Sequence, residues 1–384
     1  MSTVAKKKAP PLLPPEAHGR PEFSPLWELP DPTISKDGEW YYLYATGQGI
    51  EARRSRDLID WEVLPSVFPD PVPAWAKEKI PGADSIWAPD IRKIGNRWHL
   101  HYSVSTLGSQ KSVLGLATAE ALDPAHPKGG WKDQGLVLAS ETRKDPYNAL
   151  DSSVCLDETG RPWIVWGSYF SGIFLAEADP ATGKLVPGAQ HHHVATRVPG
   201  NGHQGNPGPG IEGPVIVRKH GRFYLFVSLA DQINYHVVVG RADRITGPYL
   251  DRMGKPLLGE GGTPVIAPYG KYRGNGHNGA LVDECPWFDI FVNHTLMERL
   301  APGGGGSHPT PSPGHTEHGR PLDSSGGLAG CPESGISKRR NPAGSAGSPG
   351  PLGASREQSA TALVVGPKRK VFPSSGWRQL RRKG

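Results

Sequence analysis

Three acidic residues stand at the edges of β-rich segments, namely Asp31 in LPDPT, Asp151 in YNALDSS and Glu212 in GIEGP. Breaking a glycosidic bond requires one carboxylic acid that protonates the leaving oxygen and a second carboxylate that activates water or attacks the sugar. Acids held apart on rigid β-scaffolding can perform these two tasks. Taken singly, each acid also has an ordinary structural explanation, because an Asp beside Pro or Ser accepts hydrogen bonds from turn backbone and a Glu can simply be exposed.

The elements that must position these acids are short strands that recur along the chain. Aromatic and β-branched runs begin at Trp40, Arg97, Pro162, Arg222 and Trp287, about 60 residues apart. Sheets repeated at this interval are typical of propeller blades, so five repeats predict an all-β, five-bladed β-propeller whose innermost strands line a central channel. A β-sandwich of unrelated strands is the alternative, although its acids would share no axis on which to converge. Only PAWAKEKI and TAEALDP are candidates for short helices.

The composition of the 384 residues agrees with a β-protein, because 50 Gly and 40 Pro argue against a helical one. No run of about 18 apolar residues occurs, so we expect no membrane span. The opening MSTVAKKKAPPLLPP lacks the apolar stretch of a signal peptide. We therefore expect a cytoplasmic protein, or a secreted one if the true N-terminus is missing. Cys155, Cys285 and Cys331 are too scattered for a disulfide framework or a CxxC metal site.

The predicted layout is an N-terminal extension at residues 1–22, a propeller domain at 23–300 and a disordered, basic tail at 301–384. The tail is rich in Gly and Pro, has few apolar residues and shows no period. It holds 12 Lys and Arg against 4 Asp and Glu, a net charge of +8 in a chain of net +6. Such charge could contact anionic polymers. Solvated charge runs more often have no specific partner, so we expect no nucleic-acid partner and a monomer.

Longer motifs around the acids carry a resemblance to a known family. Between about residues 25 and 295 the chain contains, in this order, DPT, WYYLYATGQGI, SIWAPDI, HYSVSTLGS, YNALD, WGSYFSGI, GIEGP, GGTPV and GHN. This ordered set resembles the arabinanases of glycoside hydrolase family 43. The resemblance implies an inverting enzyme without an organic cofactor, whose substrate is α-1,5-linked L-arabinan or arabino-oligosaccharides of the plant cell wall.

The resemblance also assigns roles to the acids. Asp31 is similar to the general base that deprotonates water, Glu212 to the general acid, and Asp151 to the residue that orients Glu212 and raises its pKa. An inverting pair implies a separation of about 6.5–9.5 Å between Asp31 and Glu212, with room for water, whereas a retaining pair would be about 5–5.5 Å apart.

Side chains near the acids are candidates for sugar contacts. Trp87 in SIWAPDI offers a flat apolar face to a sugar ring, although Trp is also a common core residue. The resemblance favours Trp87 for substrate contact, with Asn148 and Ser168 as partners of sugar hydroxyls. Asp90 could hydrogen-bond the sugar or support the loop. Leu107 stands where many relatives carry an aromatic residue, so a stacking subsite is expected to be weaker here.

His277 in GNGHNG is the expected metal-linked residue. In related arabinanases the matching histidine helps to hold a hydrated ion, usually calcium, whose other ligands are mostly water. Calcium prefers oxygen ligands to imidazole. The alternative is therefore a histidine that hydrogen-bonds near Asp151 without a metal.

We expect an arabinan endo-1,5-α-L-arabinosidase. The alternatives are an exo-acting arabinofuranosidase or β-xylosidase of the same family and a catalytically impaired arabinan-binding protein. The last alternative arises because TLMERLAPGGGG follows DIFVNH where another aromatic segment and a closing strand are expected. A change of reading frame near Thr295 would produce this departure and leave the last blade incomplete. Retaining fructan hydrolases are less favoured, since their WMNDPNG start is missing from the chain.

Overall fold

The computed structural model describes residues 26, 29–197, 210–230, 234–269, 272–282, 288–297 and 358–367. The predicted extension at 1–22 and most of the predicted tail lie outside these residues. All the described residues belong to one compact unit, and a second unit at Arg299–Glu357 lies wholly outside them. Within these ranges, no helix is long and apolar enough to span a membrane.

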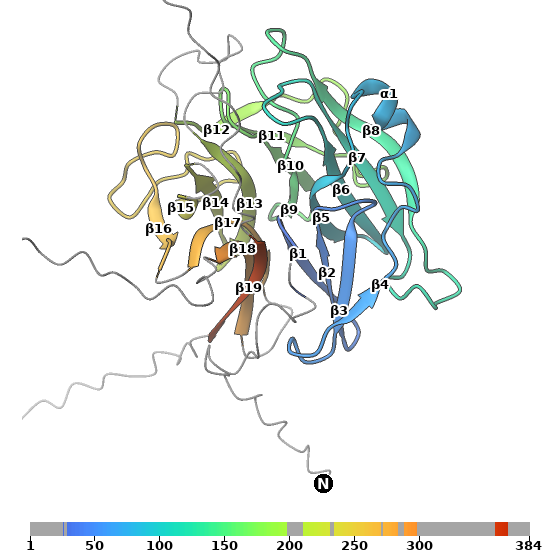
Figure 1. Cartoon of the computed structure of the whole chain (residues 1–384). Helices are drawn as coiled ribbons and strands as arrows, with labels where there is room; N and C mark the ends of the chain where they lie inside the picture. The colour runs from blue at the N-terminus through green and yellow to red at the C-terminus, as the bar shows by residue number, and fades with distance from the viewer. Residues whose placement is uncertain are drawn as a thin grey trace, which may run out of the picture. The chain divides into compact units, whose positions relative to one another are not determined.

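The described chain forms five antiparallel sheets, each built from strands that are consecutive in sequence (Figure 1). The strands of the first two sheets are β1 Thr33–Asp37, β2 Trp40–Ala45, β3 Glu51–Ser55 and β4 Glu62–Leu64, then β5 Trp87–Ile94, β6 Arg97–Val104, β7 Ser112–Ala119 and β8 Lys132–Ser140. Those of the third and fourth are β9 Ser153–Leu156, β10 Pro162–Trp166, β11 Ile173–Glu177 and β12 His192–Ala195, then β13 Ile211–Lys219, β14 Arg222–Leu229, β15 His236–Ala242 and β16 Thr263–Ile266. The fifth sheet contains β17 Tyr272–Leu281, β18 Phe288–Met297 and β19 Gln358–Pro367.

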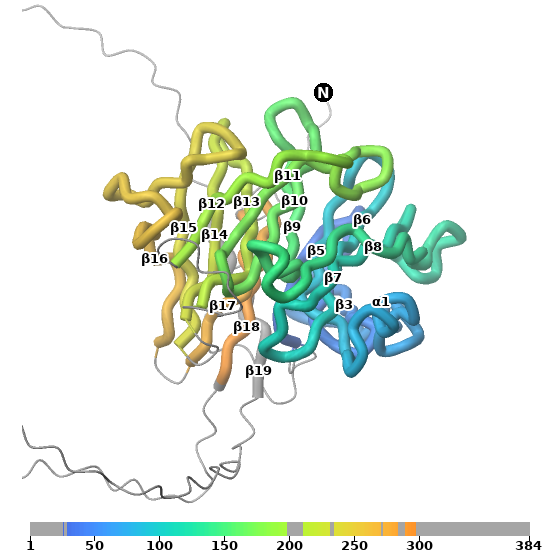
Figure 2. Tube along the Cα trace, turned by 90° about the horizontal axis from the view of Figure 1, so that it is seen from above, coloured from blue at the N-terminus to red at the C-terminus, as the bar shows by residue number. Residues whose placement is uncertain are grey.

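The first strands of the five sheets form a closed ring. β1 contacts β5, β5 contacts β9, β9 contacts β13, β13 contacts β17, and β17 returns to β1. Seen from above, β9, β13 and β17 lie in the middle, while β8 and β16 lie at opposite sides (Figure 2). This arrangement confirms the predicted five-bladed β-propeller, because a β-sandwich has no such ring of inner strands.

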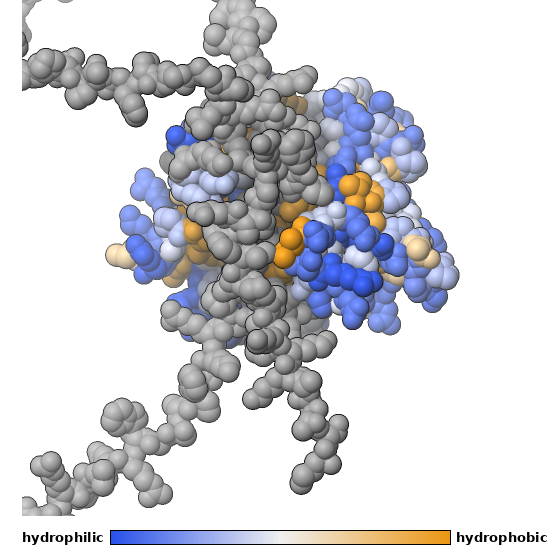
Figure 3. Space-filling view, turned by 60° about the horizontal axis from the view of Figure 1, so that its bottom comes forward, coloured by the Kyte–Doolittle hydropathy of each residue, from blue (hydrophilic) through white to orange (hydrophobic). Residues whose placement is uncertain are grey.

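The hydrophobic core fills the space between neighbouring sheets. Tyr42 and Tyr44 of β2 pack in one cluster with Leu100 and Tyr102 of β6, and all four side chains are nearly inaccessible to solvent. Strands such as β7 are buried along their whole length, which is why aromatic and β-branched residues form these runs. Most of the coloured residues on the face seen in Figure 3 are hydrophilic, as expected when the apolar residues lie between the sheets.

One of the two predicted helices is present. Helix α1, Ala74–Lys79, lies in the PAWAKEKI segment. The prediction for TAEALDP is wrong, because Thr118 and Ala119 end strand β7, and Thr118 pairs with Lys132 of β8. Pairing between strands that are distant in sequence overrides the local preference for a helix.

The fifth sheet differs from the other four. It has three strands, and the third, β19, comes from the segment that we predicted to be disordered. β19 pairs with β18 from Phe288 opposite Pro367 to Met297 opposite Gln358. The segment QSATALVVGP has the small and β-branched residues that suit a strand, and the Gly- and Pro-rich composition of the tail as a whole conceals it. The rest of the predicted tail lies outside the described residues.

Candidate active site

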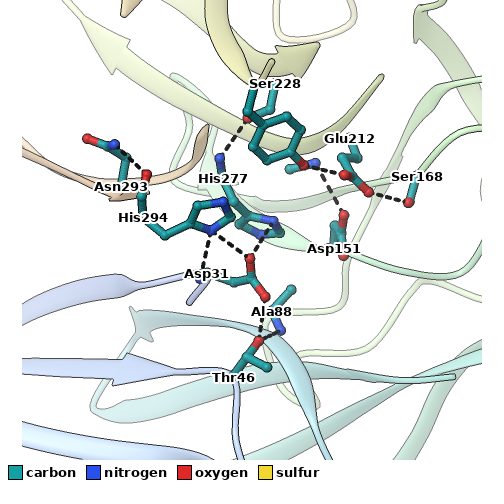
Figure 4. A network of polar contacts seen from close by, with 12 residues as sticks. Asp31, Thr46, Ala88, Asp151, Ser168, Glu212, Ser228, His277, Asn293 and His294 are labelled. Atoms are coloured by element: carbon teal, nitrogen blue, oxygen red, sulfur yellow. Dashed lines mark hydrogen bonds and ion pairs between the residues drawn. The ribbon is translucent and has the colours of Figure 1, made fainter. Parts of the chain in front are cut away.

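The three acids lie in one layer of the channel wall. Asp31 comes two residues before β1, Asp151 comes two residues before β9, and Glu212 is the second residue of β13. Because the inner strands of a propeller surround one axis, residues at equivalent positions on them converge. Figure 4 shows the three acids in one polar network with His277 of β17 and His294 of β18.

A left-handed backbone conformation marks this layer in every blade. Each inner strand has a residue of positive φ in this layer, either within the strand or just before it: Asp31 (51°), Ala88 (43°), Asp151 (56°), Gly213 (57°) and His277 (45°). For residues other than Gly this conformation costs roughly 1–2 kcal/mol. Gly213 also needs its small size, since a Cβ atom there would lie 3.3 Å from His277. Strain repeated at equivalent positions is typical of functional layers whose side chains must be aimed.

The neighbouring second strands anchor this strained layer. The second strand of each sheet ends at or near a residue with a hydroxyl or imidazole side chain. These five residues are Thr46, Ser103, Ser168, Ser228 and His294. Three hydroxyls accept the backbone N–H of the next blade's left-handed residue: Thr46 from Ala88 (2.8 Å), Ser103 from Asp151 (2.9 Å) and Ser228 from His277 (2.8 Å). The backbone of the acid layer is therefore held by a repeated contact between blades.

Asp31 lies between a hydroxyl and two imidazoles. Its Oδ2 accepts a hydrogen bond from Thr46 Oγ1 at 2.6 Å, and its Oδ1 lies 3.1 Å from His294 Nδ1 and 3.3 Å from His277 Nδ1. Burial opposes ionisation of Asp31, but His277, His294 and Thr46 together hold its pKa well below the usual range. The carboxyl group is therefore ionised at neutral pH.

Asp151 has the opposite electrostatic behaviour. It is 6% exposed, and burial is the main cause that raises its pKa well above the ordinary value. The charges of Glu212 and Asp31 raise this pKa further. A hydrogen bond of 3.3 Å from the Gly213 N–H to Asp151 Oδ2 acts in the opposite direction and lowers it. Asp151 is the more buried of the two neighbouring acids and faces two other carboxylates, which is why its own ionisation is opposed. The role predicted for Asp151, that of orienting Glu212 and raising its pKa, stays a prediction.

Glu212 is held by two hydroxyl donors. Ser168 Oγ donates to Glu212 Oε2 at 2.6 Å, and the Tyr235 hydroxyl donates to Oε1. Burial raises the pKa of Tyr235 well above its ordinary value, and the charge of Glu212 raises it further. Tyr235 therefore remains a hydrogen-bond donor at neutral pH, and the Glu212 carboxyl group is fixed in one orientation.

The predicted sugar contacts occupy different environments. Trp87 is half-buried beside the left-handed Ala88, and its Nε1 donates to Ser85 Oγ at 3.1 Å. Asn148 is 3% exposed, accepts from Ser112 Oγ at 2.7 Å and donates to a backbone carbonyl at 3.2 Å. Its amide is thus hydrogen-bonded within the protein, and its predicted contact with sugar stays a prediction. Ser168 is only 5% exposed and its hydroxyl donates to Glu212, so it positions this acid. Its predicted contact with a sugar hydroxyl stays a prediction.

Asp90 and Leu107 were also singled out from the sequence. Asp90 accepts the Thr33 hydroxyl at 3.2 Å and the Val154 N–H at 3.0 Å, so it supports the channel wall. Leu107 is 92% exposed and leaves this surface position without an aromatic ring.

His277 is the residue expected to help hold a calcium ion whose other ligands are mostly water. Its Nδ1 faces Asp31, and no group of three His, Cys, Asp or Glu side chains among the described residues could hold a metal ion. Calcium prefers six to eight oxygen ligands, so water would have to supply most of them here. The calcium ion at His277 therefore stays a prediction, to be tested by metal analysis of the purified chain.

Two site residues were missed by the sequence interpretation. His294 contacts Asp31 and stacks on the ring of Tyr235 with centroids 5.5 Å apart, and Tyr235 in turn binds Glu212. A signal for His294 was available, since the repeated runs WYYLYAT, WHLHYS, WIVWGS, FYLFVS and FDIFVNH all end in Ser, Thr or His. Tyr235 lies outside these runs and carries no comparable signal.

Comparison with known proteins places this geometry in a family. Residues 26–312 match the family model described as Glycosyl hydrolases family 43. The chain is 37% identical over 257 residues to an extracellular endo-α-(1→5)-L-arabinanase of Bacillus subtilis, which covers 65% of this chain and 75% of that protein. It is 33% identical over 262 residues to an extracellular exo-α-(1→5)-L-arabinofuranosidase of Cellvibrio japonicus, covering 66% and 75% respectively.

Solved structures agree with this match. The α-L-arabinanase of Cellvibrio cellulosa has a TM-score of 0.67 and 32% identity, covering 70% of this chain and 87% of that one. An exo-1,5-α-L-arabinanase from a bovine ruminal metagenomic library has a TM-score of 0.64 and 33% identity, covering 70% and 88%. Because the family match spans most of the chain and includes all three acids of the channel layer, this chain belongs to the glycosyl hydrolases of family 43.

Proposed function

We propose that this chain is an inverting glycoside hydrolase that cleaves α-1,5-linked L-arabinan within the polymer. The observation that carries the proposal is that three carboxyl groups share one layer in two electrostatic environments. Asp31 is ionised between two imidazoles, whereas Asp151 and Glu212 form a pair with a raised pKa at Asp151. Hydrolysis with inversion requires one ionised and one protonated carboxyl group. The Bacillus subtilis relative that is named an endo-arabinanase supports the choice of substrate.

Asp31 is the proposed general base. Thr46 binds one of its oxygens, and the other faces His277 and His294, so the side chain has a fixed orientation and a low pKa. A water molecule that donates a hydrogen bond to this carboxylate transfers a proton to Asp31 as its oxygen attacks the anomeric carbon.

Glu212 is the proposed general acid. Ser168 and Tyr235 orient its carboxyl group, and Asp151 lies close enough for the charge of Glu212 to oppose the ionisation of Asp151. Such a pair retains one proton in a buried site. Transfer of a proton from Glu212 to the leaving oxygen completes bond cleavage.

Product analysis tests the proposal. Linear α-1,5-arabinan and an aryl α-L-arabinofuranoside are each incubated with the full chain, and products are resolved by size over time while NMR follows the anomeric configuration. We expect oligosaccharides to form early from the polymer, with inverted configuration. Asp31→Asn should abolish this activity, whereas Asp243→Asn, a change at an exposed carboxylate, should not. Retention of configuration, or normal activity of Asp31→Asn, would contradict the mechanism.

An exo-acting enzyme is the second candidate, because the Cellvibrio japonicus relative is named an exo-arabinofuranosidase. Release of monosaccharide alone from the polymer would select it. Binding of arabinan without any product would instead favour an impaired binding protein. The fifth sheet argues against that last outcome, since it places His277 and His294 against Asp31.

A further inference from the structure

A cavity lies on the channel axis, away from the acid layer. It has a volume of about 320 Å³ and is lined by the first strands of all five sheets, through residues that include Lys36, Arg92, Leu156, Arg218 and Leu281. Each inner strand reaches this cavity after it passes the acid layer. Arg92 follows Ala88 by four residues and Arg218 follows Gly213 by five, or roughly 13–16 Å along a strand. The cavity is therefore the opposite mouth of the channel.

The walls of this cavity are positively charged. Lys36, Arg92, Lys93 and Arg218 line it, and Asp90 is the one carboxylate among the lining residues that the structure describes. Both oxygens of Asp90 already accept hydrogen bonds within the channel wall. The cavity therefore has an excess of positive charge that its own acid does not neutralise.

The two lysines are already engaged by the protein. Lys36 Nζ donates to the Gly38 carbonyl oxygen at 3.0 Å. Lys93 Nζ lies 5.0 Å from the centre of the Trp98 ring, within the range of a cation–π interaction. The guanidinium groups of Arg92 and Arg218 are thus the cations left to face the cavity.

Neither Arg92 nor Arg218 forms a hydrogen bond or ion pair with another residue that the structure describes. The charge of Arg92 does act on Asp90, where it opposes the burial that raises the pKa of Asp90 to about 6. Arg92 and Arg218 lie on either side of one strand, because β5 and β13 both contact β9. Burial raises the pKa of the Cys155 thiol on β9 to about 12, and the charges of Arg92 and Arg218 oppose this rise. Both arginines therefore lie near the same thiol. Two unpaired guanidinium groups across one strand form a pair of planar donor forks.

We propose that this channel mouth binds a small oxyanion, either a phosphate or the carboxylate of an acidic sugar, between Arg92 and Arg218. Guanidinium groups bind both kinds of oxyanion through two parallel hydrogen bonds. The cavity has room for the anion together with bound water, since one water molecule occupies about 30 Å³ in the liquid. This site is independent of the three acids and of the proposed hydrolysis.

Calorimetric titration of the full chain tests the proposal at low ionic strength. Inorganic phosphate and galacturonate are titrated separately, and the tighter of the two identifies the source of the oxyanion. We expect binding at one site, weakened about tenfold or more by Arg92→Gln or Arg218→Gln through loss of a charge-assisted bidentate contact. Arg92→Lys keeps the charge but loses the fork, so it should bind more weakly than the unchanged chain.

Arg252→Gln is the matched control, since it removes the same charge at an exposed position outside the cavity. Thermal unfolding of each variant shows whether it is folded, and the exposed Arg218 provides the test if Arg92→Gln fails to fold. Failure of both probes to bind would overturn the proposal. An equal loss of affinity in Arg252→Gln would also overturn it, because binding would then follow net charge alone.

Discussion

Replacement of Thr46 by Val tests how the structure keeps Asp31 ionised. The Thr46 hydroxyl donates to Asp31 Oδ2 at 2.6 Å and accepts the Ala88 N–H at 2.8 Å. Val has nearly the same shape but no hydroxyl, so the change removes both hydrogen bonds without a large cavity. A hydrogen bond to a charged group contributes about 1.5–3 kcal/mol, and 1.36 kcal/mol corresponds to one pKa unit. We therefore expect the pKa of Asp31 to rise by about 1–2 units.

The direction of the pH effect follows from the sign of this shift. A general base acts only when it is ionised, so a higher pKa of Asp31 moves the acid limb of kcat/KM to higher pH. The folded-state pKa of Asp31 is depressed, so its ionisation stabilises the fold above the unfolded pKa, and this stability is lost as pH falls through the folded pKa. Thr46→Val reduces the contribution of Asp31 ionisation to the free energy of unfolding at neutral pH. The Ala88 N–H, left without its acceptor, lowers the free energy of unfolding by about 1–3 kcal/mol more.

Initial rates on arabinan over a graded pH series at constant ionic strength measure the shift. Thr46→Ser keeps the hydroxyl and should restore the original acid limb. Thr118→Val is the matched control, because Thr118 is a buried threonine of β7 whose hydroxyl binds Gln134 at 3.0 Å. An unchanged acid limb in a folded Thr46→Val variant would refute the reasoning, as would an equal shift in Thr118→Val.

Three further changes separate the roles of the other site residues. Asp151→Asn should abolish hydrolysis and yet raise the Tm by about 2 °C or more at neutral pH. The reason is that a carboxyl group with a raised folded-state pKa loses its stabilising contribution as pH rises. Calorimetry at neutral and acidic pH should show the gain in Tm only at neutral pH. Glu212→Gln should lower kcat on arabinan by about 10²–10⁴-fold and spare aryl arabinofuranosides with acidic leaving groups, so an equal loss on both substrates would count against Glu212 as the acid. Tyr235→Phe removes one hydrogen bond to Glu212 and should lower kcat about tenfold with little change in KM; a change confined to KM in steady-state assays would indicate a substrate contact instead.

Much of the fold was predictable because it depends on local chemistry. Aromatic and β-branched runs separated by turns form strands in all five sheets, and their regular spacing predicted the propeller. Where local composition misled, distant partners decided the outcome. Residues Thr118 and Ala119 pair with β8 instead of entering a helix, and Gln358–Pro367 pairs with β18 although its surroundings are rich in Gly and Pro.

The sequence by itself determined which carboxyl groups are available for chemistry, since Asp31, Asp151 and Glu212 carry that capacity in their side chains and recur in ordered motifs. Only the tertiary structure decided their protonation, because a pKa depends on burial and on charges from other blades. His294 reaches Asp31 across 263 residues of sequence. The segments that connect the strands likewise place Asn148 in the interior and direct Ser168 to Glu212, which no local pattern specifies.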